Sequence, residues 1–441
     1  MKDVLRKSSD PAVNQLLIKA YRQQDELIWD RMDAMQPQDG FGRLGLSCND
    51  CYEGPCRVNP FDPVDQHTAC GRDKKDLAAA ALLRRALNGA AALTGLARER
   101  GGKVLIDCSM ADVMPGNADL ACGLACAGKT AAAALNALAP AKAEPTTAQV
   151  NMGALKADVA NIVLIGHVRP DFVAALRAAA KDANLLTVCG NEGLGLPLLT
   201  NYDSQETVLL TGAVDLLVCG SQCVMPATVR LAEQLGVPME RLGFADSFDA
   251  AAAAAKAAAH QKTRKNADIP AFSAQARTGY AAADMAKLAE TILAAKPKGL
   301  VYLGGCGNIK HTQDQDLVAL AMQLQAAGYL LVTGGCAGTA LAKAGLCNAD
   351  SGLPKALNLG SCCDVSCLFE LAKNLKGLPV FAALPELTQG KNLAVAVALS
   401  AGGIPTLISA AAMPGLDAND TGKLLLPVAD FAQLPKMLAS I

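Results

Sequence analysis

The segment Val301-Tyr302-Leu303-Gly304-Gly305-Cys306 is a short apolar run that ends in two glycines and a cysteine. Such a run, bounded by glycine, is typical of a strand buried on both faces of a parallel sheet. Five further apolar runs lead in the same way to a histidine or a cysteine: residues 162–165 to His167, 185–188 to Cys189, 216–218 to Cys223, 331–332 to Cys336 and 357–359 to Cys362. The six placements indicate that potential metal ligands follow buried strands.

Alanine-rich helical stretches alternate with the apolar runs, which is the pattern of a parallel sheet covered by helices. A first group of runs begins at residues 104–106, and the polar stretch 261–267 is the expected linker to a second group. We therefore predict an α/β fold. A small helical N-terminal cluster-binding domain (residues 1–100) is followed by two doubly wound, Rossmann-like parallel-sheet domains (101–265 and 266–441).

A shared metal site is one interpretation of the six strand-end ligands. Taken alone, each cysteine would be a buried apolar side chain and His167 a structural histidine, because such residues are commonly buried. Open parallel sheets bind ligands outside the carboxyl ends of their strands, so the six together favour one cluster between the two sheet domains. Cys219, Cys363 and Cys367 lie close in sequence to these ligands, and their role stays open.

A second cysteine pattern lies in the N-terminal domain. Cys48, Cys51, Cys56 and Cys70 follow the spacing C-x2-C-x4-C-x13-C in a glycine-rich loop, between helical patterns at residues 16–35 and 76–98. Four thiolates on such a loop are suited to a 4Fe-4S cube. On spacing alone, a tetrahedral zinc site is the alternative.

The composition excludes several classes of protein. Forty basic and 41 acidic residues leave a net charge near zero, so neither nucleic acid nor an anionic membrane surface is expected as a partner. Sixteen cysteines without an apolar export signal favour metal binding over a disulfide scaffold, and a cytoplasmic location is expected. No apolar stretch approaches the roughly 20 residues that span a bilayer.

These motifs resemble those of the nickel–iron carbon monoxide dehydrogenase catalytic subunit, whose structural relatives are the hybrid cluster proteins. The segment GLSCNDCYEGPCRVNP at residues 45–60, with Cys70-Gly71, is similar to the family loop that binds a 4Fe-4S relay cube, the B-cluster. Lys391, in PELTQGK, matches the family lysine that hydrogen-bonds the bound carbon dioxide unit, which implies a catalytic role. The segments that resemble the ligand segments of the family's nickel–iron–sulfur C-cluster hold His167, Cys189, Cys223, Cys306, Cys336 and Cys362.

The chain departs from the family pattern in four respects. The cluster shared across the family's dimer interface needs cysteines at Asp39 and Ser47, so we expect that cluster to be absent or differently ligated. Leu93 takes the place of a histidine that begins a proton relay. The helical insertion before the first sheet domain is mostly missing. The segment 361–367 carries two additional cysteines, Cys363 and Cys367.

The resemblance implies an anaerobic oxidoreductase that converts carbon monoxide and water to carbon dioxide, two electrons and two protons. Its cofactors would be the 4Fe-4S cube and a Ni-Fe-S cluster, or an iron-only variant of that cluster. Two alternatives stay open: a hybrid-cluster-like reductase of small nitrogen compounds of the hydroxylamine type, with Glu192 as an oxygen ligand, and a non-catalytic redox-sensing protein. The implied partners are a second copy in a homodimer, a ferredoxin-like electron carrier and a small gaseous substrate.

Overall fold

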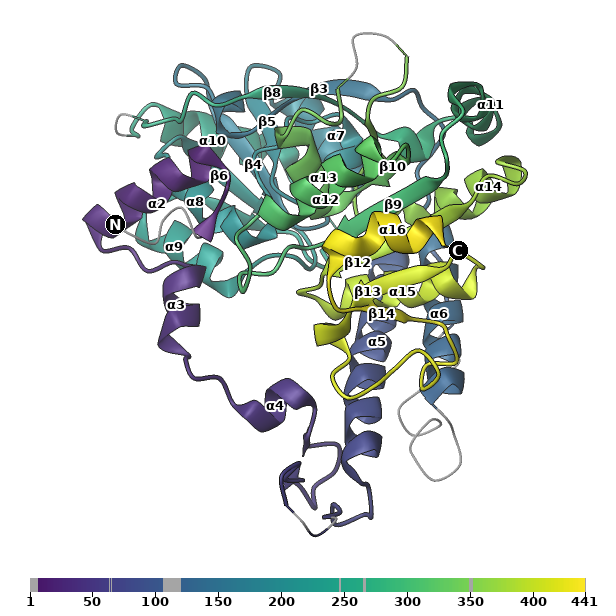
Figure 1. Cartoon of the computed structure of the whole chain (residues 1–441). Helices are drawn as coiled ribbons and strands as arrows, with labels where there is room; N and C mark the ends of the chain where they lie inside the picture. Colours follow the sequence, from purple (N-terminus) through teal and green to yellow (C-terminus); the bar gives the residue numbers. More distant parts are fainter. Residues whose placement is uncertain are drawn as a thin grey trace. The chain divides into compact units, whose positions relative to one another are not determined.

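The structure is a computed structural model, which describes residues 7–62, 64, 66–105, 120–245, 247–264, 267–348 and 352–440. The chain forms two compact units. Unit 1 consists of Met1–Asp33 and Leu138–Pro379, and unit 2 consists of Ala34–Ala137 and Val380–Ile441. Figure 1 labels the helices and strands of both units. Each unit therefore combines segments that lie far apart in the sequence.

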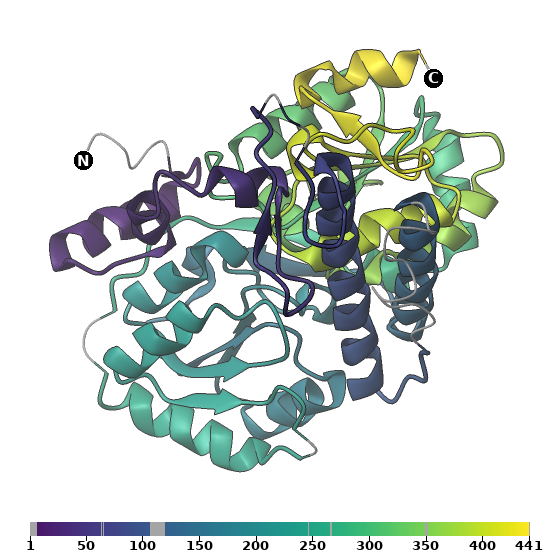
Figure 2. The same ribbon diagram turned by 90° about the horizontal axis from the view of Figure 1, so that it is seen from below.

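A four-stranded parallel sheet in unit 1 has the strand order β5-β4-β6-β7. Successive side chains of a strand point to opposite faces. Ile162 and Leu164 of β4 accordingly share a core with α7 and α10, whereas Val163 and Ile165 share another with α8 and α9. The sheet is therefore covered by helices on both faces (Figure 2). Its elements are β4 (Asn161–Ile165), β5 (Asn184–Thr187), β6 (Val214–Cys219), β7 (Met239–Arg241), α7 (Pro170–Ala179), α8 (Gln205–Leu210), α9 (Pro226–Gln234) and α10 (Ala250–Gln261).

The helical pattern predicted at residues 16–35 corresponds to two helices instead of one. Helix α2 (Pro11–Gln23) ends where Gln24 takes a left-handed backbone conformation, and α3 (Ile28–Ala34) begins after a short connection. The apolar face of α2 packs against α8 in unit 1, where Leu16 and Leu17 are buried. The N-terminal helix is therefore part of the unit that holds the strand-end ligands.

A second sheet in unit 1 has the order β9-β10-β11-β8-β3, in which only β3 runs antiparallel to its neighbour. Helix α13 contacts β8, β9, β10 and β11, and α12 packs on β10. Parallel strands β9, β10 and β11 therefore end on the same side, as expected for a ligand-binding edge. The elements are β3 (Thr146–Val150), β8 (Ala274–Thr278), β9 (Leu300–Gly305), β10 (Leu330–Thr333), β11 (Ala356–Asn358), α11 (Met285–Ala295), α12 (Gln315–Ala326), α13 (Gly335–Lys343) and α14 (Cys367–Asn374).

A buried ion cluster connects the start of α2 with α12 and α13. The Nζ atom of Lys343, at the end of α13, lies 2.8 Å from Asp10 Oδ2 and 2.5 Å from Asp314 Oδ2. Asn151 donates a further hydrogen bond to Asp10 Oδ1 at 3.1 Å. Burial opposes the charge of Lys343, but the two carboxylates outweigh it and raise the pKa of the lysine. Lys343 is therefore a fixed positive charge.

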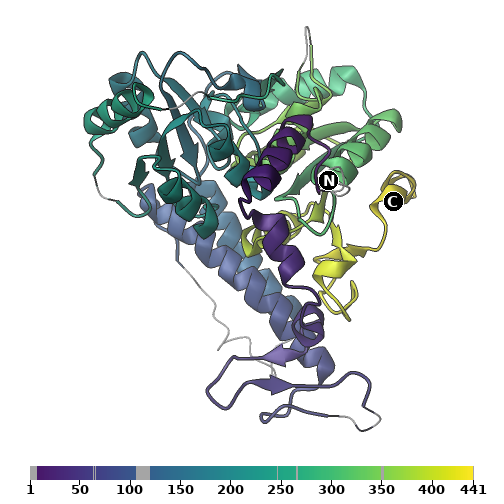
Figure 3. The ribbon, with the colours of Figure 1, turned by 90° about the vertical axis from the view of Figure 1, so that its left-hand side faces the viewer.

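Unit 2 is built on three helices that pack along one another: α5 (Lys74–Glu99), α6 (Leu120–Ala137) and α15 (Gly390–Ala401). Its strands β12 (Val380–Glu386), β13 (Thr406–Ser409) and β14 (Leu426–Val428) are parallel. Figure 3 shows the cysteine loop at the N-terminal end of α5, with strands β1 (Ser47–Cys48) and β2 (Cys56–Arg57) paired in it. Among the described residues, unit 2 also contains the α-helices α4 (Gly40–Leu44) and α16 (Leu434–Ala439).

A glycine contact allows α5 and α15 to approach closely. A Cβ atom at Gly89 of α5 would lie 2.0 Å from the carbonyl oxygen of Gly390 and 2.8 Å from Ala394 Cβ. We expect Gly89→Ala to lower the free energy of unfolding by about 1–3 kcal/mol, because the added methyl group forces the helices apart. Urea denaturation followed by circular dichroism measures this loss.

Gly95, further along α5, provides the matched control. A Cβ atom at Gly95 meets nothing within 4 Å, and alanine favours a helix over glycine by about 1 kcal/mol. Gly95→Ala is therefore expected to be neutral or stabilising. An equal loss of stability in both variants would contradict the proposed contact.

Helix α6 differs from one expectation of the sequence analysis. Its 18 residues, Leu120–Ala137, have a mean hydropathy of 1.2, so by length and composition alone the helix could cross a membrane. Its apolar residues, among them Leu124 and Leu135, are buried where α6 packs on α5 and α15. A core helix accounts for this composition equally well.

The elements group in space differently from the predicted domains 1–100, 101–265 and 266–441. The cysteine loop and α5 share unit 2 with residues 380–441, because α15 packs against α5 and α6. Local periodicity does not report which helices share a core. The division into three independently folding domains stays a prediction. The strand expected at residues 104–106 is not formed at Val104 and Leu105, and residue 106 lies outside the described residues.

Candidate metal centre

His167 follows the carboxyl end of β4 in a tightly constrained turn. Gly166 before it has a φ of +76°, and a Cβ atom there would lie 2.3 Å from the carbonyl oxygen of Gln222. The backbone N–H of His167 donates to Ser221 O at 2.9 Å, and Ser221 N–H donates back to His167 O at 2.9 Å. These contacts fix the histidine, whose side chain is buried, at the end of the strand.

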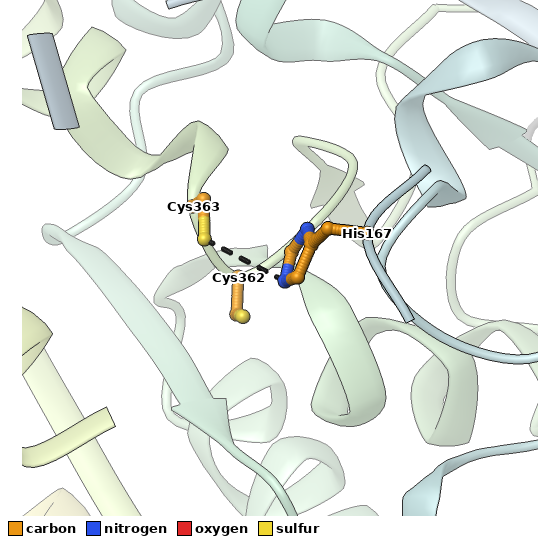
Figure 4. Close-up of side chains that lie close together, drawn as sticks. All are labelled: His167, Cys362 and Cys363. Atoms are coloured by element: carbon orange, nitrogen blue, oxygen red, sulfur yellow. Dashed lines mark hydrogen bonds between the residues drawn. The ribbon is translucent and has the colours of Figure 1, made fainter. Parts of the chain in front are cut away.

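The His167 ring lies next to two consecutive cysteines, Cys362 and Cys363 (Figure 4). The Cys363 Sγ atom is 3.9 Å from His167 Nε2. The ligand atoms of all three residues lie within 4.8 Å of one another. Within the part of the chain that the structure describes, this is the only group of three or more such ligands that is so close. We call it the His167 group.

A glycine turn brings the two cysteines to this position. Gly360, which follows β11, has a φ of +128°, and a Cβ atom there would lie 2.5 Å from Asp364 Oδ2. The Ser361 N–H donates to the same carboxylate oxygen at 2.6 Å. A Cβ atom at Gly335, the first residue of α13, would lie 2.8 Å from Cys362 Cβ. Only glycine, with its freedom at positive φ, fits both positions.

Three more predicted ligands lie together elsewhere in unit 1. Hydrogen bonding with the Cys223 and Cys336 side chains, together with burial, raises the pKa of the Cys189 thiol well above its ordinary value. The Tyr202 N–H donates to Cys336 Sγ at 3.4 Å, and Cys189 Sγ donates to the carbonyl oxygen of Cys223 at 3.5 Å. Cys223 has a φ of +54°, which is strained for a residue with a side chain. The three cysteines therefore form a second group, the Cys189 group.

Tyr302, which the sequence analysis did not single out, interacts electrostatically with several cysteine sulfurs. Its side chain is buried in β9, just before the predicted ligand Cys306. Burial raises the pKa of its hydroxyl well above the ordinary value, and the nearby sulfurs raise it further. Those sulfurs belong to Cys362, Cys363, Cys367 and Cys306. These cysteines therefore act electrostatically on one buried hydroxyl, which an apolar strand pattern could not reveal.

Glu192 is buried close to His167. Its carboxylate accepts a hydrogen bond from the Gly190 N–H at 2.9 Å, as expected for a structural role. Burial raises the pKa of Glu192 to about 7, although backbone hydrogen bonds and His167 oppose the shift. The carboxyl group therefore exchanges its proton near neutral pH.

The residues of unit 1 fit a metal centre that contains iron or nickel. Thiolate and imidazole are ligands of both metals. Two ligand atoms on one tetrahedral ion lie about 3.5–4 Å apart, given metal bonds of about 2.0–2.3 Å. The 3.9 Å between Cys363 and His167 falls in this range. The structure thus gathers the predicted ligands of this centre into the His167 group, the Cys189 group and Cys306.

The N-terminal cysteines are gathered less closely. Cys48 and Cys56 are directly opposite in the β1–β2 pair, whereas Cys51 and Cys70 are exposed. The structure describes all four cysteines, and no three of their sulfur atoms lie within 4.8 Å of one another. Arg72 donates to Cys48 Sγ at 3.3 Å and to Asp50 at 2.7 Å. Burial and the neighbouring Asp50 raise the pKa of the Cys48 thiol, although Arg72 opposes the shift, whereas a hydrogen bond with Thr68 lowers the pKa of Cys70.

The other predicted positions differ in environment. Lys391 lies in the first turn of α15 with only 3% of its surface exposed, so it is not an ordinary surface charge. Leu93 is fully buried in α5, where it packs as an apolar residue. Asp39 caps α4, accepting a hydrogen bond from Gly42 N at 3.0 Å. Burial raises the pKa of Cys219 to about 11, as for a packed thiol.

The chain is similar to known proteins along most of its length. Residues 103–429 match the model of the Prismane/CO dehydrogenase family. Carbon monoxide dehydrogenase 1 of Carboxydothermus hydrogenoformans is 27% identical to this chain, with 91% of each protein covered. Carbon monoxide dehydrogenase of Rhodospirillum rubrum is 26% identical, with 90% of each covered. The first alignment is 580 positions long, against 441 residues here, so many positions of the relative have no counterpart.

A solved structure supports the fold. Carbon monoxide dehydrogenase IV from Carboxydothermus hydrogenoformans superimposes with a TM-score of 0.82 at 22% identity, covering 99% of this chain and 98% of the other. The predicted α/β fold, with an N-terminal helical region and parallel-sheet domains, is thereby confirmed. The family match extends over about three quarters of the chain and includes every ligand of the His167 and Cys189 groups. The chain therefore belongs to the Prismane/CO dehydrogenase family.

Proposed function

We propose that this protein is a carbon monoxide dehydrogenase, which oxidises carbon monoxide with water to carbon dioxide and releases two electrons and two protons. The proposal is supported by two groups of strand-end ligands in unit 1. His167 lies within 4.8 Å of Cys362 in one group. In the other group, Cys189 Sγ donates to the carbonyl oxygen of Cys223 at 3.5 Å, and the side chains of Cys223 and Cys336 raise the pKa of Cys189. The related proteins that match along most of the chain are carbon monoxide dehydrogenases.

The residues of unit 1 would hold a nickel–iron–sulfur centre. When bound, such a centre supplies a metal that polarises a small molecule and lowers the pKa of bound water, and it accepts electrons. The side chains of His167, Cys189, Cys223, Cys306, Cys336 and Cys362 hold it in place. All except Cys223 and Cys362 are at most 9% exposed, so the chain excludes bulk water from the centre. Low water access strengthens every charge interaction of a small reactant.

The remaining parts of the proposal rest on the resemblance. Cys48, Cys51, Cys56 and Cys70 would bind a 4Fe-4S cube that carries electrons away, and Lys391 would donate a hydrogen bond to the carbon dioxide unit. We propose a homodimer, a ferredoxin-like acceptor and a cytoplasmic location. The proton route must differ from the family pattern, because the buried Leu93 carries no ionisable group.

Metal analysis and a viologen-linked assay test this proposal. Protein purified without oxygen is expected to contain close to one nickel per chain together with iron and sulfide. It should reduce a viologen dye under carbon monoxide, whereas the Cys306→Ala variant should not. Cys306 is a suitable control because it is a buried predicted ligand that directly follows β9.

Other results of these measurements would identify one of the two alternative functions. Iron without nickel, with reduction of hydroxylamine by reduced viologen, would identify the hybrid-cluster-like reductase. Iron–sulfur spectra without turnover of either substrate would identify a redox-sensing protein. Nickel-replete, reduced protein that shows no carbon monoxide oxidation above the Cys306→Ala control would refute the proposed activity.

A further inference from the structure

Cys363 is the member of the His167 group that the family pattern does not account for. It is one of two additional cysteines in the segment 361–367. Its side chain is 1% exposed, and its Sγ atom is 3.9 Å from His167 Nε2. Figure 4 marks the interaction between the Cys363 sulfur and the His167 ring with a dashed line. The geometry therefore brings an additional sulfur next to Nε2 of the His167 ring.

The local backbone presents the two neighbouring sulfurs together. The Ser361 N–H donates to Asp364 Oδ2 at 2.6 Å, which closes the turn, and the Cys363 N–H donates to Ser361 Oγ at 3.3 Å. Asp364 and Ser361 are themselves buried. The turn is thus held by two hydrogen bonds that do not involve either sulfur. Cys363 is positioned by the fold and not by its contact with His167 alone.

Cys367, the other additional cysteine, behaves differently. Its Sγ atom donates to the carbonyl oxygen of Asp364 at 3.3 Å, within the first turn of the following helix. It is not a member of the His167 group. Burial raises the pKa of its thiol far above the ordinary value. Cys367 is therefore an ordinary packed thiol in the same segment.

We propose that Cys363 is a further metal ligand, which would hold the centre together with His167 and Cys362. On binding, Cys363 forms one sulfur–metal bond and releases its thiol proton to the buffer. The proposal rests on one part of the proposed function, which is that unit 1 binds a metal centre. It requires neither nickel nor turnover of carbon monoxide.

Resistance to a chelator gives the first test. The full chain, purified without oxygen, is incubated with increasing concentrations of EDTA, and the iron and nickel that remain are counted. Loss of even an outer-shell partner weakens metal binding by about 10–100-fold. Cys363→Val, which keeps an apolar side chain of similar size, should therefore release metal at a chelator concentration at least about tenfold lower. The matched variant Cys367→Val should release it at the wild-type concentration.

Selenium labelling gives a second test that keeps the ligand in place. Selenocysteine containing a magnetic selenium isotope is introduced at position 363, and the electron paramagnetic resonance spectrum of the reduced protein is recorded. A selenium atom bound to the centre adds a hyperfine splitting. Selenium at position 367 should add none. This readout remains valid if the valine variant does not fold.

The results separate the possible roles of Cys363. Splitting at position 363 together with early metal release supports ligation, whether or not the protein oxidises carbon monoxide. Early metal release without splitting would show that Cys363 only positions His167, and the proposal would be wrong. Equal chelator resistance of Cys363→Val and Cys367→Val, again without splitting, would show a packed thiol and would equally overturn it.

Discussion

Replacing Cys336 by alanine is expected to remove the metal centre of unit 1. Cys336 accepts a hydrogen bond from the Tyr202 N–H at 3.4 Å, and its side chain contributes to the raised pKa of Cys189. Alanine cannot bind metal in place of the Cys336 thiolate, so metal binding should weaken by at least about 10–100-fold. Metal binding also contributes to folding. The variant should therefore contain less iron and unfold at a lower temperature, as measured by metal analysis and by thermal denaturation without oxygen.

Cys347→Ala is the control for this substitution. Cys347 is fully buried, and its Sγ atom lies 3.9 Å from the carbonyl oxygen of Gly338. Burial raises the pKa of this thiol to about 12, so it stays protonated and uncharged. The control removes a buried sulfur atom outside both groups and should keep the wild-type metal content. An equal loss of iron from both variants would mean that Cys336 acts through packing.

Replacing Lys343 by methionine is expected to lower the free energy of unfolding by about 3–5 kcal/mol at neutral pH, because it leaves buried carboxylates without a counter-charge. Lys343 lies 2.8 Å from Asp10 and 2.5 Å from Asp314. All three side chains are at most 8% exposed. The midpoint of urea denaturation, monitored without oxygen, measures the loss.

Lys7→Met provides the comparison for a solvent-exposed pair. Lys7 lies 2.8 Å from Asp30, but the two side chains are 21% and 45% exposed. An exposed ion pair contributes about 0–1 kcal/mol, so this variant should be close to wild type. If Lys343→Met were no more destabilising than Lys7→Met, the buried cluster would not stabilise unit 1.

The effect of Lys343→Met should also depend on pH. Burial alone would raise the pKa of Asp10, but the charge and hydrogen bonds of Lys343 lower it below the ordinary value of 3.8. A lowered carboxyl pKa stabilises the folded state above the pKa of the unfolded chain, and this stabilisation is lost as the pH falls through the lowered value. The difference between wild type and variant should therefore be largest at neutral pH and shrink in acid.

The candidate site shows which features can be predicted from sequence. The apolar runs before His167, Cys189 and Cys223 are strands β4, β5 and β6, and those before Cys306, Cys336 and Cys362 are β9, β10 and β11. A run of apolar residues reports a buried strand, and a parallel sheet carries the residue after each strand to the same edge. Local pattern and sheet geometry together were therefore sufficient for these six positions.

The contribution of Cys363 and Tyr302 could not be predicted in this way. Cys362 and Cys363 are adjacent and chemically identical, so their order in the sequence does not say which sulfur lies beside His167. The positive φ of Gly360 and the carboxylate of Asp364 determine the turn that presents both. Tyr302 is one apolar-strand residue among several, and only its place in β9 brings its ring near the sulfurs.

By itself, the sequence determined the strands that precede the six predicted ligands and the family to which the chain is similar, because periodicity and cysteine spacing are local properties. The tertiary structure decided which elements share a core: α2 packs with α8, and α5 packs with α15 through Gly89. It also decided that Cys363 lies 3.9 Å from His167. Contacts between residues so far apart in the chain depend on packing and on strained turns, which no local pattern encodes.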